Sequence, residues 1–448
     1  MDSIIFPMRV FAYNFTASEA QTIYDDTPAV VMITGVDVGD GDPISVKIRK
    51  QIDETNWDEA TTYLDSFGRT KKTRAKDSSG DVVSETQYDL LSRVKQVSNP
   101  YRLNNDACYD NQTEQVLCWT SSSYDELGRL KFVTSPDNAV VETQYDLATT
   151  GAEIGTVAIV IDQALKQRRS ITNALGQLTR VDEPSITNNN QLGTIDAPHQ
   201  PTKYEYNGLG DLKKVIQGEQ ERTFTYDSLK RLKSATNPES GTISYNYDAN
   251  SNLTSKTDAR GITTTYGYDR LNRVITRSYS DNTTPTVNYS YDGKGLAQNG
   301  TFTKGKLTKI TSAVSTTEYT NFDGLGRIST HQQTTDGNTY ATSYVYNLSG
   351  AMLEETYPSG RVVKNTLDTN GDLSQVQSKK ANDTFKNYAN SFNYTAAGAV
   401  SSLRLGNGRW ENTTFNNRLQ PTQIGLGTSA ANQSLLKLDY EYGELNLG

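Results

Sequence analysis

The stretch YDELGRL, from Tyr124 to Leu130, is the clearest copy of a motif that recurs about every 20 residues. Its pattern is Tyr-Asp-x-x-Gly-Arg-aliphatic. Looser copies begin at Tyr88, Tyr206, Tyr226, Tyr247, Tyr268, Phe322 and Tyr346. From Tyr206, successive copies start after 20, 21, 21 and 23 residues. Self-similarity at a fixed period indicates a repeat array, whose single unit cannot bury its apolar side alone.

One unit, RTFTYDSLKRLKSATNPESG at residues 222–241, shows what each repeat builds. Phe224 and Tyr226 alternate with threonines, which is the period-2 pattern of a half-buried strand. Asp227 then opens a tight turn, and the next strand brings Leu232 back to the tyrosine face. Pro238 and Gly241 mark the reverse turn into the following unit. The sequence therefore predicts an all-β array of stacked antiparallel β-hairpins.

Each motif residue has an expected structural role. The Asp side chain should accept hydrogen bonds from backbone amides two residues on, and the fifth position should take positive φ to close the loop. The Tyr ring should pack on the neighbouring hairpin, with its hydroxyl on a polar partner. The Arg, at the strand start, should stack on or pair with the adjoining turn. These roles cover Tyr88, Asp89, Tyr124, Asp125, Gly128, Arg129, Tyr206, Gly210, Tyr226, Asp227, Arg231, Tyr247, Asp248, Tyr268, Asp269, Arg273, Asp323, Gly326 and Arg327.

The composition agrees with thin sheets or a shell. The hydrophobic fraction is 35%, and exchanging the 27 Tyr for the 33 Gly, as surveys count it, gives about 36%. Ordinary domains reach roughly 45–50%. The net charge of −8 disfavours a nucleic-acid partner, because neutralising phosphates needs a basic face.

The motif also divides the chain. Residues 1–56 lack it and are predicted to form an N-terminal β segment. Repeats run through residues 57–181, with a cysteine-bearing insertion near 97–120, and resume over 203–448. The Pro- and Asn-rich residues 182–202 are predicted to be a surface loop between the two blocks. The best short helix candidate is DQALKQRR, residues 162–169. The last residues re-enter a repeat and stop inside it, which predicts a longer natural chain.

Cys108 and Cys118 are the only cysteines, and nine residues separate them. They would close a short disulfide loop in an oxidising compartment or remain two thiols in a reducing one. His199 and His331, the only histidines, lack metal-ligand spacing. Calcium candidates are DVGDGD, with Asp37, Asp40 and Asp42, and the turn sequences DANSN and DTNGD, for which a turn role is the stronger interpretation. No cofactor is predicted.

The N-terminus, MDSIIFPMRVF, lacks the features of a signal peptide. The strongest apolar run, Ile154 to Ile161, is much shorter than the roughly 20 residues that span a bilayer. No membrane span is expected.

The copies YDELGRL, YDSLKRL, YDANSNL and YDRLNRV resemble the YD repeats of the RHS family, over about residues 57–448. Related shells occur in bacterial polymorphic toxins, in the BC component of Tc toxins and in teneurins. The resemblance implies a spiralling sheet of hairpins that closes into a hollow shell, which in toxin members encloses a C-terminal polypeptide. Bacterial members typically carry a DPxGL-like autoproteolysis motif after the shell. Here the only Asp-Pro pair is Asp42-Pro43, followed by Ile44, so self-cleavage is not implied.

We therefore expect a non-catalytic shell segment that encloses or scaffolds another polypeptide. Its partner would be the rest of its own longer chain or an enclosed toxin polypeptide, in a secreted or cell-surface context. The alternative is a carbohydrate-binding or adhesion module that uses exposed tyrosines to stack on surface glycans.

Overall fold

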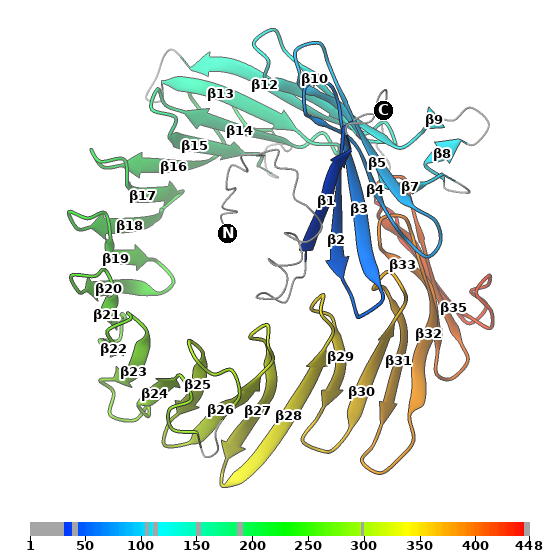
Figure 1. The fold of residues 1–448 in the computed structure, drawn as a ribbon. Coiled ribbons are helices and arrows are strands. Elements are labelled where there is room, and N and C mark those ends of the chain that lie inside the picture. Colours follow the sequence, from blue (N-terminus) through cyan, green and yellow to red (C-terminus); the bar gives the residue numbers. More distant parts are fainter. Residues whose placement is uncertain are drawn as a thin grey trace.

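The computed structural model describes residues 31–37, 44–103, 107–110, 115–148, 154–185, 191–296 and 300–442. Every regular element in these ranges is a β-strand, and 34 of the strands form a single sheet. This confirms the predicted all-β array of antiparallel hairpins. Figure 1 shows the sheet bending round into a ring-like wall. No helix in the described ranges is long and apolar enough to cross a membrane.

The strands have the following bounds: β1 (Val31–Asp37), β2 (Ser45–Gln51), β3 (Trp57–Leu64), β4 (Thr70–Ala75), β5 (Val82–Tyr88), β6 (Val94–Ser98), β7 (Tyr101–Arg102), β8 (Tyr109–Asp110), β9 (Gln115–Val116), β10 (Trp119–Tyr124), β11 (Leu130–Thr134), β12 (Val140–Ala148), β13 (Gly155–Ile161), β14 (Gln167–Thr172), β15 (Leu178–Glu183), β16 (Gln200–Tyr206), β17 (Leu212–Gln217), β18 (Gln220–Tyr226), β19 (Leu232–Asn237), β20 (Gly241–Tyr247), β21 (Leu253–Thr257), β22 (Thr263–Tyr268), β23 (Val274–Tyr279), β24 (Val287–Tyr291), β25 (Leu307–Thr311), β26 (Ser315–Phe322), β27 (Ile328–Thr335), β28 (Asn338–Tyr346), β29 (Met352–Thr356), β30 (Val362–Leu367), β31 (Leu373–Lys379), β32 (Lys386–Tyr394), β33 (Val400–Leu405), β34 (Trp410–Phe415), β35 (Pro421–Gly427) and β36 (Leu436–Asp439).

A β-bulge recurs in the hairpins that carry the motif turn. In β10/β11, Tyr124 faces Leu130 while Ser123 faces Phe132, so Lys131 is an extra residue on the second strand. The same shift follows the turn in β18/β19, β20/β21, β22/β23 and β34/β35. A bulge bends its strand and increases the local twist. Repeated on the same side of successive hairpins, it accounts for the curvature of the sheet.

The two faces of the sheet differ in chemistry. One face carries the motif tyrosines and other apolar residues, such as Tyr226 and Phe224, which are half-buried. On the other face, hydroxyl and amide side chains bond across strands, as in Thr225–Ser234 at 2.6 Å and Thr236–Thr242 at 2.8 Å. A sheet with one such polar face needs fewer apolar residues, which explains the low hydrophobic fraction.

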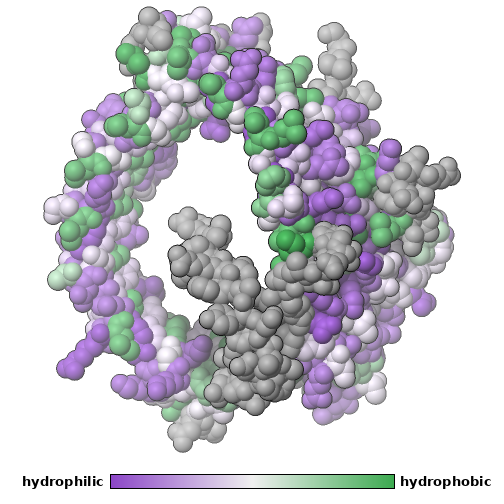
Figure 2. Space-filling model, turned by 45° about the horizontal axis from the view of Figure 1, so that its top comes forward, coloured by the Kyte–Doolittle hydropathy of each residue, from purple (hydrophilic) through white to green (hydrophobic). Residues whose placement is uncertain are grey.

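Because consecutive strands are antiparallel, the turns fall alternately on two rims of the wall. The motif rim carries the turns 65–69, 89–93, 125–129, 173–177, 207–211, 227–231, 248–252, 269–273, 323–327, 347–351, 368–372, 395–399 and 416–420. The return rim carries the intervening connections, among them 52–56, 76–81, 135–139, 162–166 and 428–435, and the residues next to the ends of β6 and β10, 99–100 and 117–118. Figure 2 shows the wall surrounding a central opening.

The fully buried core is small and local. One cluster comprises Val83, Tyr101, Cys108 and Cys118, and a second comprises Ala148, Val157 and Ile171. A thin curved sheet has no room for one large core, so each stretch of wall is held by its neighbours, as in other repeat proteins.

Three segments without clear motif copies were harder to interpret from sequence. The predicted helix over 162–169 is wrong: residues 162–166 form a turn and β14 begins at Gln167. In the predicted loop 182–202, the first residues belong to β15 and the last to β16. Between them Ser185 and Leu192 are buried. Within residues 1–56, β1 and β2 continue the sheet by pairing with each other, and β2 pairs with β3.

Candidate functional site: the motif turns and the seam of the spiral

The motif turn is organised by its aspartate. Asp125 Oδ1 accepts hydrogen bonds from the backbone amides of Leu127 and Arg129, at 3.0 and 2.8 Å. Its Oδ2 accepts from Arg129 Nε at 2.7 Å. Gly128 closes the loop with φ of 80°, a conformation that glycine adopts without steric cost. The same pattern surrounds Asp89, Asp227 and Asp269.

The motif arginine and tyrosine connect one repeat to the next. The guanidinium carbon of Arg129 lies 4.1 Å from the ring centroid of Tyr145, and that of Arg93 lies 4.4 Å from the Tyr124 ring. Arg231, Arg273 and Arg327 contact the tyrosine of the following hairpin in the same way. The tyrosine hydroxyl donates back to the aliphatic residue that closes the previous motif. Examples are Tyr226 to the Leu212 carbonyl at 2.9 Å and Tyr247 to Leu232 at 2.9 Å.

These contacts lower the pKa of the motif aspartate and raise the pKa of the motif tyrosine, so each group keeps its charge state near neutral pH. The pKa of Asp227 is lowered below 3.8, mainly by the hydrogen bond from the Arg231 amide and also by the Arg231 side chain. Burial raises the pKa of Tyr226 above 10.0. At neutral pH the carboxylate is therefore ionised and paired, and the phenol is neutral and donating. Neither group is arranged to exchange a proton with a substrate.

Turns that carry Asn in place of Asp use the side-chain amide for a similar purpose. Asn207 Nδ2 donates to Asp211 at 2.9 Å, and Asn416 Nδ2 donates to Gln420 at 3.0 Å. Asn347 differs. Its Oδ1 accepts from the Ala351 amide, but the alanine offers no side-chain acceptor, and Nδ2 is buried without a partner. Asn347 lines a pocket of about 560 Å³ with Ile52, Leu353 and Lys364.

The two ends of the sheet meet at a seam, where the motif rim of the later repeats lies on the return rim of the first repeats. The Leu348 amide donates to the Ile52 carbonyl at 3.3 Å. Arg102 pairs with Asp77 at 2.8 Å and donates to the Tyr394 carbonyl at 3.1 Å. In Figure 1, β31–β35 accordingly lie beside β4, β5 and β7. The wall is therefore a spiral that closes on itself.

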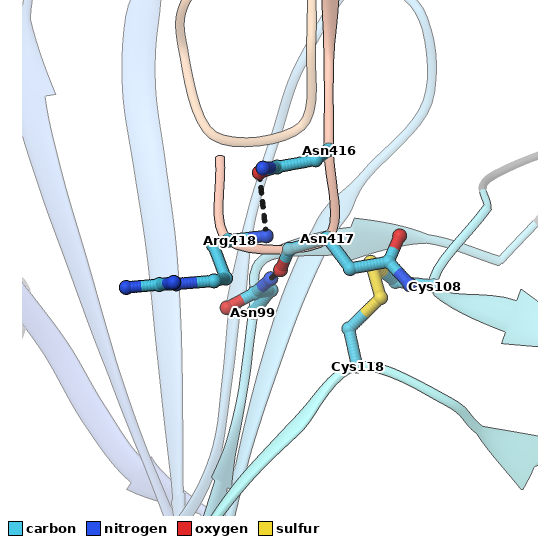
Figure 3. Close-up of a disulfide and its surroundings, with 6 residues drawn as sticks. All are labelled: Asn99, Cys108, Cys118, Asn416, Asn417 and Arg418. Atoms are coloured by element: carbon cyan, nitrogen blue, oxygen red, sulfur yellow. Dashed lines mark hydrogen bonds between the residues drawn. A yellow bond between two sulfur atoms is a disulfide. The ribbon is translucent and has the colours of Figure 1, made fainter. Parts of the chain in front are cut away.

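The last motif turn docks beside the disulfide. Cys108 and Cys118 are joined, with their Cα atoms 4.9 Å apart. Asn99, whose amide bonds the Cys118 carbonyl, donates from its side chain to the Asn417 carbonyl at 2.7 Å. Figure 3 shows Asn99 and the turn 416–418 next to the two sulfur atoms. Arg418 continues the seam by contacting Gln163 and pairing with Asp137. The disulfide therefore holds Cys118 in place, and the Cys118 carbonyl positions Asn99 for its contact with the turn 416–420.

The remaining candidate residues have structural surroundings. His199 Nδ1 lies 2.8 Å from the Gln191 carbonyl, and His331 lies between the rings of Tyr319 and Tyr344. The calcium candidates on turns are used by those turns: Asp248 and Asp368 accept backbone amides of their own loops. Asp40 and Asp42 lie outside the described residues, as does the side chain of Asp37. In the described ranges no three His, Cys, Asp or Glu side chains cluster as metal ligands.

Comparison with known protein families gives a match to one part of the array. Residues 247–284 match the family model described as RHS repeat. The units on either side have the same turn and the same inter-repeat contacts. No curated protein matches the chain in sequence.

Solved structures share the fold. The crystal structure of TcdB2-TccC3 without its hypervariable C-terminal region aligns with a TM-score of 0.74 and 15% identity, covering 90% of this chain and 22% of that one. The crystal structure of TcdB2-TccC3-Cdc42 aligns with a TM-score of 0.73 and 15% identity, covering 91% and 23%. A structure of the Photorhabdus luminescens Tc holotoxin pore aligns at 0.73 and 14%, covering 89% and 22%. The wall thus has the fold of the Tc toxin shell, and the chain spans less than a quarter of the length of these three structures.

The seam was missed from sequence. The available signal was a change in the motif after residue 346. Turns up to residue 327 mostly carry a large apolar residue at the fourth motif position, and several carry Arg at the sixth. The later turns differ at both positions. Their fourth residues are Ser349, Asn370, Ala397 and Arg418, and their sixth residues are Ala351, Asp372, Ala399 and Gln420.

Proposed function

We propose that this chain is a wall segment of an RHS-type shell that encloses another polypeptide. The observation that carries the proposal is the closure of the sheet at the seam, where Arg102 and Asn99 bond the backbone of later repeats around a central opening. The role is steric. Within the described residues, backbone pairing joins each hairpin to the next, which would keep a protease from reaching an enclosed chain through the wall.

The glycan-binding alternative is not supported by the motif tyrosines. Several of them have an arginine guanidinium on the ring, and their hydroxyls bond backbone carbonyls. They are therefore not a row of free stacking surfaces, and no other observation favours glycan binding over enclosure.

The proposal is tested by protection of a cargo. An unstructured reporter polypeptide is attached after Gly448 by a flexible linker long enough to reach the opening, and its digestion by trypsin is followed. We expect much slower cleavage than for the same reporter free in solution, and faster cleavage when Arg102→Ala weakens the seam. Equal cleavage rates for attached and free reporter would refute enclosure.

A further inference from the structure

A pocket of about 560 Å³ lies at the seam, next to the junction between the hairpins β28/β29 and β30/β31. Its lining comes from both ends of the sheet. Ile52, Asp53 and Asn56 belong to the turn after β2, and the other lining residues belong to β28, β29, β30 and the turns beside them. A molecule bound in this pocket therefore contacts the first and the later repeats at once.

In other repeats the corresponding junction is filled by the motif arginine and tyrosine. The guanidinium carbon of Arg231 lies 4.8 Å from the ring centroid of Tyr247 in the following hairpin. The hydroxyl of Tyr247 donates to the carbonyl of Leu232, the residue after that arginine. The same contacts recur at Arg273 and Tyr291. A planar ring with a hydroxyl at its end is therefore the group that such a junction normally holds.

At the junction beside the pocket both groups are replaced by smaller ones. The arginine position holds Ala351, and the tyrosine position of the next hairpin holds Leu367. The Met352 carbonyl, at the place where other repeats receive the tyrosine hydroxyl, accepts from Asn365 Nδ2 at 3.0 Å. Leu367 and Asn365 both line the pocket, so the pocket lies where the missing ring would pack.

The lining has an apolar part and an unmet donor. Ile52, Leu353 and Leu367 provide apolar surface for the faces of a ring. Asn347, which is 8% exposed, also lines the pocket, and its Nδ2 has no hydrogen-bond partner. A buried donor without an acceptor costs free energy, which a ligand oxygen at this place recovers. Apolar walls with a few polar groups that fix orientation are the usual form of a small-molecule site.

The charged lining residues select against an anion. The carboxylates of Asp53, Glu354 and Asp368 line the pocket, and among the described lining residues they face one cation, Lys364, which pairs with Glu354 at 3.7 Å. Three carboxylates against one ammonium leave an excess of negative charge. An anionic ligand is repelled, whereas a neutral hydroxyl can donate its hydrogen to a carboxylate.

We propose that this pocket is a binding site for a neutral phenol, whose ring takes the place of the missing motif tyrosine. The ring packs between Ile52, Leu353 and Leu367, and the hydroxyl oxygen accepts from Asn347 Nδ2. The phenol is either a free compound or the tyrosine side chain of a bound polypeptide, and the chemistry of recognition is the same. Because the walls belong to both ends of the sheet, an occupied pocket strengthens the seam. The proposal does not depend on whether the wall encloses a polypeptide.

Binding of p-cresol, which is the tyrosine side chain as a free molecule, tests the proposal. Titration followed by NMR should show saturable binding. The melting temperature should rise with the p-cresol concentration, because the ligand binds the folded, closed wall. Toluene lacks the oxygen and p-toluate is an anion, so each should bind at least about 5-fold more weakly than p-cresol.

Two variants test the assigned position. Leu367→Tyr returns the motif ring to the junction and should abolish p-cresol binding without lowering the melting temperature. Its matched control is Leu229→Tyr, since Leu229 is 64% exposed on a motif turn away from the pocket, and this control should bind p-cresol like the wild type. Ala351→Gln offers Asn347 an acceptor within the chain and should remove the preference for p-cresol over toluene.

A blocked peptide, Gly-Gly-Tyr-Gly-Gly, distinguishes the two sources of the phenol. Binding as tight as that of p-cresol assigns the site to tyrosine side chains, and weaker binding assigns it to free phenols. The proposal is overturned if p-cresol shows no saturable binding, if toluene or p-toluate binds equally well, or if the Leu367→Tyr variant binds p-cresol like the wild type.

Discussion

The covered half of the motif rim comprises the turns between residues 347 and 420, which lie at the seam, and the uncovered half comprises the turns between residues 65 and 327. The two halves share one turn backbone and differ in the residues at the fourth and sixth motif positions. In both halves the residue at the second motif position accepts the amides that follow it, as Asp125 and Asn416 do. Only the uncovered turns combine a large apolar fourth residue with an arginine at the sixth position. The motif therefore has a constant part and a variable part: the second and fifth residues build the turn, whereas the fourth and sixth residues differ between the two halves.

The difference also separates two sources of stability. Uncovered repeats are held by sequential neighbours, through arginine–tyrosine contacts such as Arg129 on Tyr145. Covered repeats additionally contact strands about 300 residues away in sequence, as Asn99 contacts Asn417. Damage to an uncovered repeat should stay local, whereas damage at the seam should affect both ends of the wall.

The largest effect is expected at Arg102. Its side chain is 12% exposed and pairs with Asp77, which is 13% exposed, while also bonding the Tyr394 carbonyl. Arg102→Ala leaves a nearly buried carboxylate without this partner, a change that costs about 3 kcal/mol. Denaturant unfolding should report the loss, and small-angle scattering should report an opened ring.

Arg222→Ala is the matched control for that variant, because Arg222 pairs with the exposed Glu239 away from the seam. Exposed ion pairs contribute about 1 kcal/mol or less. If the two variants cost the same, the seam would not be the stabilising contact described here.

A smaller and local effect is expected from Tyr226 in the uncovered half. Tyr226→Ala removes a half-buried ring and the bond to Leu212, at a cost of about 2 kcal/mol. Tyr226→Phe removes only the hydroxyl, at about 1 kcal/mol. Hydrogen exchange should rise in β17–β20 and stay unchanged in β31–β35. Faster exchange at the seam would contradict the one-dimensional coupling of repeats.

The features that could be predicted from the sequence are those that depend on residues close together in the chain. The hairpins, the aspartate-centred turns and the positive φ of Gly128, Gly210 and Asn272 follow from short-range turn chemistry, and the structure contains them. The predicted helix failed for a related reason. Leu165 adopts φ of 59° at the motif position that Gly or Asn usually holds. Because leucine and its neighbours favour helices, the sequence of this turn lacked the glycine or asparagine that marks the other turns.

What could not be predicted depends on small bends added over many repeats. Each bulge rotates the sheet slightly, and only the sum brings Leu348 to Ile52. No local sequence pattern predicts the total curvature. The pairing of Arg102 with the Tyr394 carbonyl, 292 residues away, has no sequence signal of its own.

An intermediate, stabilising effect is expected from Ala351→Gln. Asn347 Nδ2 is buried without a partner, and the equivalent amides of Asn173 and Asn416 donate to Gln177 and Gln420. A glutamine at 351 supplies the missing acceptor and should add about 1 kcal/mol of stability. Gln420→Ala, which removes the acceptor from a turn in the same half, should lose a similar amount. Thermal unfolding of both variants checks the pair, and a loss in each would show that the orphaned amide is not the cause.

The smallest effect is a difference in acid response between the two halves. In the uncovered half, the pKa of Asp227 is lowered below 3.8, so its stabilisation is complete above that value and is lost as pH falls through the lowered pKa. At the seam, burial, together with the charges of Asp368 and Asp77, raises the pKa of Asp372 above 3.8. Its ionised form therefore opposes folding at neutral pH. As pH falls through the raised pKa, the seam gains stability, and the gain is complete at and below 3.8.

Asp372→Asn isolates that contribution. The variant should be more stable at neutral pH by on the order of 0.5 kcal/mol or less after allowing for solvent screening, because it removes a carboxylate that burial and the like charges of Asp368, Asp77 and Asp58 disfavour. It should also abolish the strengthening of the seam between neutral pH and about pH 4, measured by hydrogen exchange in β31–β33, while exchange at the turn 227–231 keeps its wild-type acid profile. Asp383→Asn is the control, since Asp383 lies on an exposed return-rim turn and has a lowered pKa, mainly from the hydrogen bond of the Thr384 amide. A seam that weakens in acid to the same degree in the wild type and in Asp372→Asn would show that the two halves do not differ in this way.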